Sequence, residues 1–187
     1  MLFTNRYSQT ILQARQAKDR FVQSAADSPL PWEERHHFTG LRYFPPNRSY
    51  RLTAQIALLP ESERVALATS DGQEQWYLRY ARLHFKIDRQ PYQLVAYRSA
   101  HEHGAHPEIA LFVPFRDALA GRETYGSGRY LDLGYDPHAS PESLIVDFNL
   151  AYNPYCAYSS AYSCPIPPRE NWLTCAIRAG ERSFHMA

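Results

Sequence analysis

The feature that most constrains this chain is an alternation of apolar and polar residues that begins near residue 50. Apolar side chains at every second position give a β-strand one face for a core and one for solvent. Such segments are Tyr50–Leu58 and Arg64–Thr69, and the Ser-Asp-Gly-Gln turn at 70–73 leads into a third that ends near Ile87. The apolar set of the third segment changes parity at Tyr80, which predicts a β-bulge there.

Further short segments with strand composition follow. The Asp-Arg-Gln-Pro sequence at 88–91 is predicted to turn the chain back. The strands predicted after it are Tyr92–Arg98, Glu108–Phe115, Arg129–Leu133, Leu144–Asn149 and Trp172–Arg178. An aromatic fraction of 14%, with 14 Pro against 8 Gly, also favours strands and rigid loops over long helices. We therefore predict a mainly β member of the α+β class, built as an antiparallel barrel or a two-sheet sandwich.

The first 39 residues follow a helical period instead. From Tyr7 to about Ser24 one stripe is apolar, while four charged residues fall elsewhere. The stripe contains Tyr7, Ile11, Ala14, Phe21 and Val22, and the charged residues are Arg6, Arg15, Asp19 and Arg20. Pro31 can begin a short second helix. We expect a single domain over 1–187, with a helical segment 1–39 packed outside a β-rich body 41–187.

The charge balance excludes several classes of partner. Lys and Arg total 20 and Asp and Glu 19, so the net charge of +1 leaves no electrostatic footprint for nucleic acid or an anionic membrane. Three cysteines and no secretory pattern at the N-terminus predict a soluble cytoplasmic protein with free thiols. The uncharged run 148–168 is too rich in Asn, Tyr, Ser and Pro to span a membrane. We expect it to lie against the domain.

Four strings in the C-terminal half together form a family signature, at residues 123–133, 147–154, 156–159 and 164–168. With them, the chain resembles the domain-of-unknown-function 1684 family of prokaryotic proteins. That family has no assigned activity, so the resemblance implies positions and not chemistry. The positions it marks are Arg129, Tyr130, Asp147, Asn149, Tyr152, Asn153, Cys156, Tyr158, Cys164 and Asn171.

Two of these polar residues share a strand face. Alternation over 144–149 places Asp147 and Asn149 on the side opposite to Val146. With Arg129 opposite, they would form a cluster able to orient a small anionic or amide-bearing ligand. The alternative is that both side chains cap the backbone of the following loop. The predicted ligand-binding residues are Arg129, Tyr130, Asp147, Asn149, Tyr152, Asn153 and Tyr158.

The thiols and histidines are weaker candidates. Cys156 and Cys164 each lie near a proline, so their sulfurs can meet to ligate zinc, to form a redox pair or to supply a nucleophile. Without a CxxC spacing, buried cysteines that act as small hydrophobic residues are the favoured interpretation. His101 and His103 with Glu108 resemble the first metal motif of cupins, but no second motif follows, which favours an exposed loop.

Three classes of function fit these observations. The leading hypothesis is a small-molecule binding domain whose polar and aromatic pocket is built from the C-terminal third. The second is a metal-dependent enzyme with Cys or His ligands. The third is a non-catalytic interaction or scaffold protein that uses exposed tyrosines as contact area. No motif in the chain points to a particular cofactor.

Overall fold

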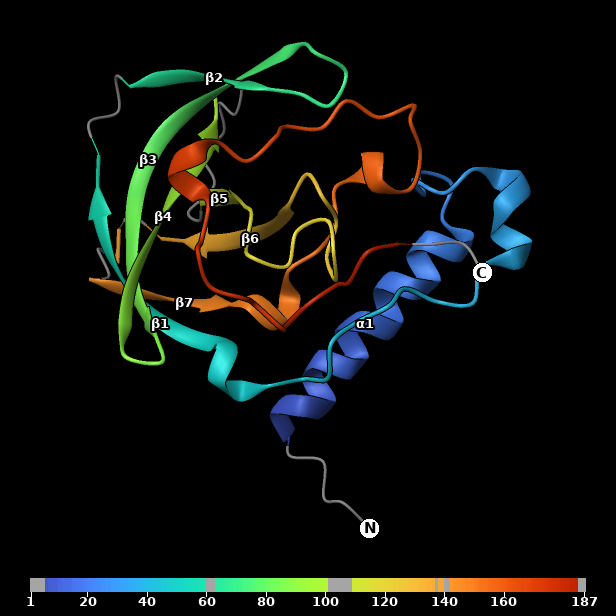
Figure 1. The fold of residues 1–187 in the computed structure, drawn as a ribbon, viewed down its shortest axis with the longest axis horizontal. Helices are drawn as coiled ribbons and strands as arrows, with labels where there is room; N and C mark the ends of the chain where they lie inside the picture. Colours follow the sequence, from blue (N-terminus) through green and yellow to red (C-terminus); the bar gives the residue numbers. More distant parts are fainter. Residues whose placement is uncertain (1–5, 60–62, 101–108, 137, 140–141, 185–187) are drawn as a thin grey trace.

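The computed structural model describes residues 6–59, 63–100, 109–136, 138–139 and 142–184. Within them, seven strands form one antiparallel sheet that curls around the core into a nearly closed barrel (Figure 1). The strands are β1 (Arg51–Leu58), β2 (Arg64–Ala68), β3 (Glu74–Ile87), β4 (Gln90–Ser99), β5 (Ile109–Phe115), β6 (Arg129–Tyr135) and β7 (Ser143–Asp147). The mainly β fold class predicted from the alternation is therefore confirmed, in its barrel form.

The strand order is β6-β5-β4-β3-β1-β7, and β2 pairs with β3 outside this path. The two end strands, β6 and β7, contact each other but share no ladder. The register of β3 against β4 shifts between Arg79 and Ala81, which confirms the predicted bulge at Tyr80. Such a bulge increases the local twist of a strand, and here it lets the long β3 curve with the barrel wall.

The β3–β4 hairpin is tighter than expected. Gln90 and Pro91 already pair with Ile87 and Lys86, so the turn consists of Asp88 and Arg89 alone. Both have positive φ angles, 49° and 68°, which is the conformation that a two-residue hairpin loop requires. The wider turn predicted at 88–91 is corrected accordingly.

The core fills the inside of the barrel. Phe148, which directly follows β7, is fully buried, and its ring packs edge to face against Phe85 and Phe115 at centroid distances of 5.7 and 5.2 Å. β7 ends one residue earlier, at Asp147, and residues 148–150 form a 3₁₀ turn. The strand predicted over Leu144–Asn149 is therefore too long, because Asp147 caps this turn.

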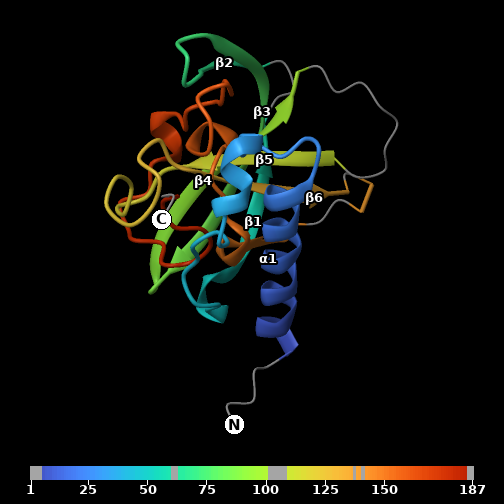
Figure 2. The ribbon, with the colours of Figure 1, turned by 90° about the vertical axis from the view of Figure 1, so that its right-hand side faces the viewer.

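The helix α1 (Arg6–Ser24) runs along the outside of the barrel (Figure 2). Ile11 and Val22 are buried as predicted, but Ala14 is exposed and Arg15 is buried to 8% exposure. The Arg15 guanidinium donates to the backbone carbonyl of Phe44 at 2.8 Å. The prediction that position 15 faces away was wrong because part of the helix packs on loop backbone, whose carbonyls require a donor.

Replacing the central core ring gives a first test. We expect Phe148→Ala to lower the free energy of unfolding by about 3–5 kcal/mol, because it removes apolar contacts and leaves a cavity. Urea unfolding followed by circular dichroism measures the loss. The control is Ile145→Ala on the adjoining strand β7, whose side chain is 40% exposed. It should cost less than about 1 kcal/mol. Equal losses in the two variants would contradict this view of the core.

Candidate functional site

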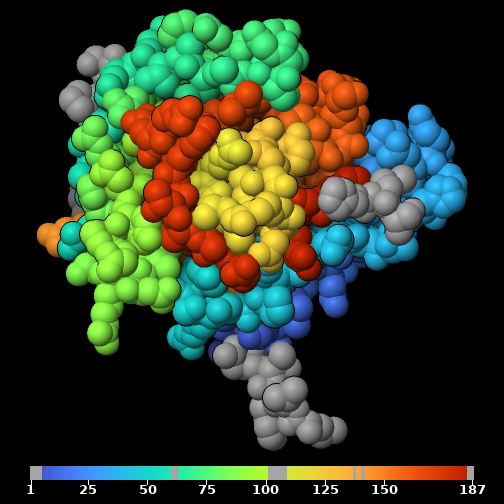
Figure 3. All heavy atoms as spheres, in the orientation of Figure 1, coloured from blue at the N-terminus to red at the C-terminus, as the bar shows by residue number. Residues whose placement is uncertain are grey.

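The C-terminal segment after residue 148 has little regular structure and wraps around the barrel. It meets β6 through a backbone bridge between Tyr130 and Tyr152. Further along, it encircles the loop that follows β5, as the red band around the yellow surface in Figure 3 shows. The predicted ligand-binding residues are distributed between the interior side of this segment and a cleft on its outer side.

Arg129, the first residue of β6, is 1% exposed and belongs to the interior side. Its guanidinium donates to the backbone carbonyls of Ile177, Ala179 and Glu181 and to the carboxylate of Asp117. Carbonyls two residues apart in an extended chain face the same way, so this side chain takes the place of a neighbouring strand. Burial lowers the pKa of Arg129 to about 10, against the opposing effect of Asp117, so it stays charged at neutral pH.

This contact also explains why the strand predicted over Trp172–Arg178 is wrong. Residues 169–171 form a 3₁₀ turn, and Trp172 makes only an isolated bridge with Arg116. Leu173 donates to the Arg116 carbonyl at 2.7 Å, and beyond it the guanidinium of Arg129 begins to bind the carbonyls. Residues 172–178 therefore have the apolar alternation of a strand but form no ladder of backbone hydrogen bonds with a neighbouring strand.

Removing this guanidinium gives a second prediction. Arg129→Met keeps the apolar stem but leaves three carbonyls without this donor and the buried Asp117 without its charged partner, so we expect a loss of about 3–5 kcal/mol in unfolding free energy. Chemical denaturation measures it. Arg178→Met is the matched control, since that side chain is 58% exposed and paired only with Glu123 at the surface. It should cost about 1 kcal/mol or less. A mild effect at position 129 would contradict the structural role.

Asp147 and Asn149, like Arg129, use their side chains to bind the backbone of neighbouring segments. An Asp147 oxygen accepts from the Asn149 amide at 3.0 Å, and Tyr7 donates its hydroxyl to the carboxylate at 2.8 Å. The Asn149 side chain bonds both the amide and the carbonyl of Asn47, at 2.7 and 2.8 Å. Asp147 lines a hollow between α1 and the barrel, but its ion-pair neighbour is Arg51 at 3.7 Å and not Arg129. The contacts of Asp147 and Asn149 thus correspond to the alternative in which both side chains bind loop backbone.

Asn153 and Tyr158 converge on a residue that the sequence analysis missed. Glu181 is 1% exposed. Its carboxylate accepts from the backbone amide of Asn153 at 2.8 Å and from the Tyr158 hydroxyl at 2.7 Å. Lys18 of α1 pairs with the same carboxylate at 2.5 Å. Burial and this carboxylate raise the pKa of Tyr158. Glu181 lies in a short polar stretch near the C-terminus, where no periodicity separates a buried carboxylate from an exposed one.

Tyr130 and Tyr152 face the outer side, where they line a cleft of about 600 Å³. The cleft lies between α1, the outer faces of β3, β5 and β6, and residues 154–165. Most of its wall is aromatic. The aromatic side chains that line it are Phe21, Tyr77, Phe112, Tyr130, Tyr152, Tyr155 and Tyr162. Three of these seven rings, those of Phe21, Tyr77 and Phe112, come from outside the C-terminal third and were not predicted as site residues.

The rings of the cleft are held in fixed orientations. Phe112 and Tyr130 meet edge to face with centroids 4.7 Å apart, and Tyr77 stacks on Phe112 at 5.4 Å. The Tyr130 hydroxyl donates to the Pro165 carbonyl, and the Tyr152 hydroxyl donates to the Asp132 carboxylate at 2.6 Å. Burial raises the pKa of both tyrosines far above the ordinary range. The cleft therefore presents neutral, oriented aromatic surface.

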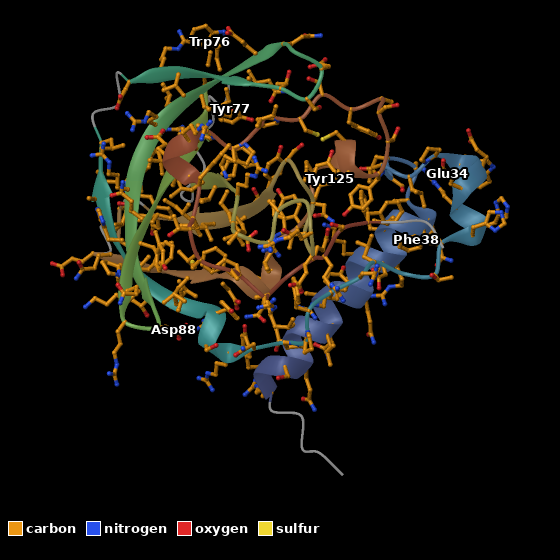
Figure 4. All side chains as sticks on the ribbon, viewed as in Figure 1. Glu34, Phe38, Trp76, Tyr77, Asp88 and Tyr125 are labelled. Carbon is orange, nitrogen blue, oxygen red and sulfur yellow. The ribbon has the colours of Figure 1, made fainter. Side chains whose placement is uncertain are left out.

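The two predicted thiols do come together beside this cleft. The Cys156 amide donates to the Cys164 sulfur at 3.2 Å, and the Tyr125 hydroxyl lies 3.8 Å from the Cys156 sulfur. Figure 4 places Tyr125 next to the short helix that carries Cys156. His101 and His103 lie outside the described residues. In the part of the chain that the structure describes, no three His, Cys, Asp or Glu side chains gather around a metal position.

These features define a β-barrel domain with an outer helix and an aromatic cleft bordered by a tyrosine- and proline-rich segment. The family model described as a protein of unknown function, DUF1684, matches residues 36–182. The chain therefore belongs to the DUF1684 family, as the sequence resemblance indicated.

A solved relative has the same fold. The chain is 43% identical to an uncharacterised protein of Haloarcula marismortui whose solution NMR structure superposes with a TM-score of 0.70, covering 93% of each chain. No curated protein matches the chain. Among the described residues, no helix is long and apolar enough to cross a membrane.

Proposed function

We propose that this protein binds a small molecule with a planar ring in the aromatic cleft. The supporting observation is the set of seven aromatic side chains around about 600 Å³ of open volume. That volume falls within the range typical of small-molecule sites, about 300–1,000 Å³. Rings whose hydroxyls are already bonded lose little conformational freedom when a ligand stacks on them, which favours affinity.

The polar groups of the cleft narrow the ligand class to molecules without a strong net charge. Lys18 and Asp132 are its charged lining residues, and each already has a partner. Lys18 pairs with Glu181 and lies 4.5 Å from the centroid of the Tyr152 ring, while Asp132 accepts from the Tyr152 hydroxyl. A phosphorylated or highly anionic ligand would find no unpaired cation in the described lining. A neutral heteroaromatic group with one or two hydrogen-bonding atoms fits better.

This proposal keeps Tyr130 and Tyr152 as ligand-contacting residues. It assigns a positioning role to the other five predicted residues, which bind backbone or carboxylate groups under the C-terminal segment. Those five are Arg129, Asp147, Asn149, Asn153 and Tyr158. We further propose that the protein works in the cytoplasm, where its free thiols would remain reduced.

Neutral heteroaromatic probes test the proposal. We expect indole or quinoline, titrated into ¹⁵N-labelled protein, to shift amide resonances of cleft residues in a saturable manner. Tyr155→Ala removes one ring of the wall and should weaken the binding about 5- to 10-fold, as expected for the loss of one stacking contact. The dissociation constants from the titrations measure this change.

The matched control is Trp76→Ala. Trp76 is 47% exposed, does not line the cleft, and points away from the molecule in Figure 4. This variant should bind the probes as the parent chain does. Shifts spread over the whole surface, or an equal weakening in both variants, would contradict a ligand site in the cleft.

A further inference from the structure

The contact between Cys156 and Cys164 is closer and more polar than two packed hydrophobic side chains require. Besides the bond from the Cys156 backbone amide to the Cys164 sulfur, each thiol shifts the pKa of the other, downwards for Cys156 and upwards for Cys164. The third cysteine, Cys175, interacts with Tyr92 and not with this pair. Because the Cys164 sulfur lies within hydrogen-bond distance of the Cys156 backbone, a local rearrangement can bring the two sulfurs to the roughly 2.05 Å of a disulfide.

The two sulfurs have different environments. Cys164 is buried, whereas Cys156 is half-buried. The Cys164 thiol and the hydroxyls of Ser70 and Tyr125 surround the Cys156 sulfur, and the Tyr125 oxygen lies 3.8 Å from it. Interaction with the Cys164 thiol, and then with the hydroxyls of Ser70 and Tyr125, favours the anionic form of this sulfur and lowers the pKa of Cys156 to about 6. The same contact and burial raise the pKa of Cys164. A thiolate is the reactive form of cysteine, so the half-buried sulfur is the nucleophile of the pair.

The backbone at Cys164 is held by the turn between β2 and β3. Cys164 donates its amide to the Ser70 hydroxyl at 3.1 Å and accepts from the Ser70 amide at 2.9 Å. The neighbouring Pro165 forms a bridge with Thr69, which ties this stretch to the turn between β2 and β3. Cys156 lies in the short helix 155–157, which has no side-chain cap. Cys156 and Cys164 therefore belong to two separately bonded stretches of backbone that meet at the sulfur of Cys164.

We propose that Cys156 and Cys164 are a redox-active pair that is oxidised by a small hydroperoxide and closes to a reversible disulfide. The Cys156 thiolate attacks one peroxide oxygen, the O–O bond breaks, and the departing alkoxide or hydroxide takes a proton from water. This step forms a sulfenic acid. The Cys164 sulfur then attacks the sulfenic sulfur, the S–O bond breaks, and water leaves with the Cys164 proton. The two sulfurs lose two electrons in total, which reduce the peroxide to an alcohol or water, and an external dithiol returns both sulfurs to thiols.

Hydrogen peroxide tests the pair directly. The full chain is reduced, freed of reductant and treated with one equivalent of hydrogen peroxide, with no cleft ligand present. We expect the intact mass to fall by two hydrogens and peptide mapping to show a Cys156–Cys164 cross-link that dithiothreitol reverses. Cys164→Ser should trap Cys156 as a sulfenic acid that dimedone labels, and Cys175→Ser should leave the cross-link unchanged. Failure of the ligand titrations would not affect this result.

The pH dependence of alkylation provides a second readout that needs no variant. Because a thiolate forms as pH rises through the pKa, the iodoacetamide rate at Cys156 should reach half its plateau near pH 6. At pH 5 it should be roughly a tenth of the plateau. Cys175, whose pKa is raised by burial, is the internal control and should react at higher pH. Alkylation of Cys156 no earlier than Cys175, or peroxide treatment that leaves the two thiols unlinked in the unmodified chain, would overturn the proposal.

Discussion

The guanidinium of Arg129 is the interaction on which the rest of the C-terminal third depends. It lies at the start of β6 and binds three alternate carbonyls of the segment 177–181, with Asp117 balancing its charge. A buried charge without such partners would destabilise the fold by several kcal/mol. With these partners, the guanidinium attaches the irregular segment 177–181 to the barrel in the place where a neighbouring strand would otherwise pair with it.

Side chains replace sheet pairing at other points of the same segment. Asn171 accepts from the Val95 amide at 2.7 Å and donates to the carbonyls of Val95 and Pro114, so it bridges β4 and β5. Asn149 does the same for the backbone of Asn47. The polar positions that the family resemblance marks are thus mostly backbone partners. A segment rich in proline lacks many amide donors, which explains why side-chain amides and a guanidinium complete its hydrogen bonds.

The two features proposed to have chemical roles lie on the outer side of this segment, which faces α1 and the strands. The cleft and the thiol pair are neighbours there, because Cys164 lines the cleft and Cys156 lies behind it against Tyr125. Their proposed roles are separate, however. The proposed ligand binding depends on aromatic surface from five parts of the chain, whereas the proposed reactivity of Cys156 depends on the thiol and hydroxyl groups next to its sulfur.

The sequence by itself determined most of the strands, the bulge at Tyr80 and the helix α1, since each depends on the side-chain period of one short segment. It also brought Cys156 and Cys164 into consideration together, because they are eight residues apart between prolines. Only the tertiary structure decided that Arg15, Arg129 and Glu181 are buried and that Phe21, Tyr77 and Phe112 join the cleft. The physical reason is that these outcomes depend on partners distant in sequence, and a charged or aromatic residue has no local pattern that distinguishes a buried partner from solvent.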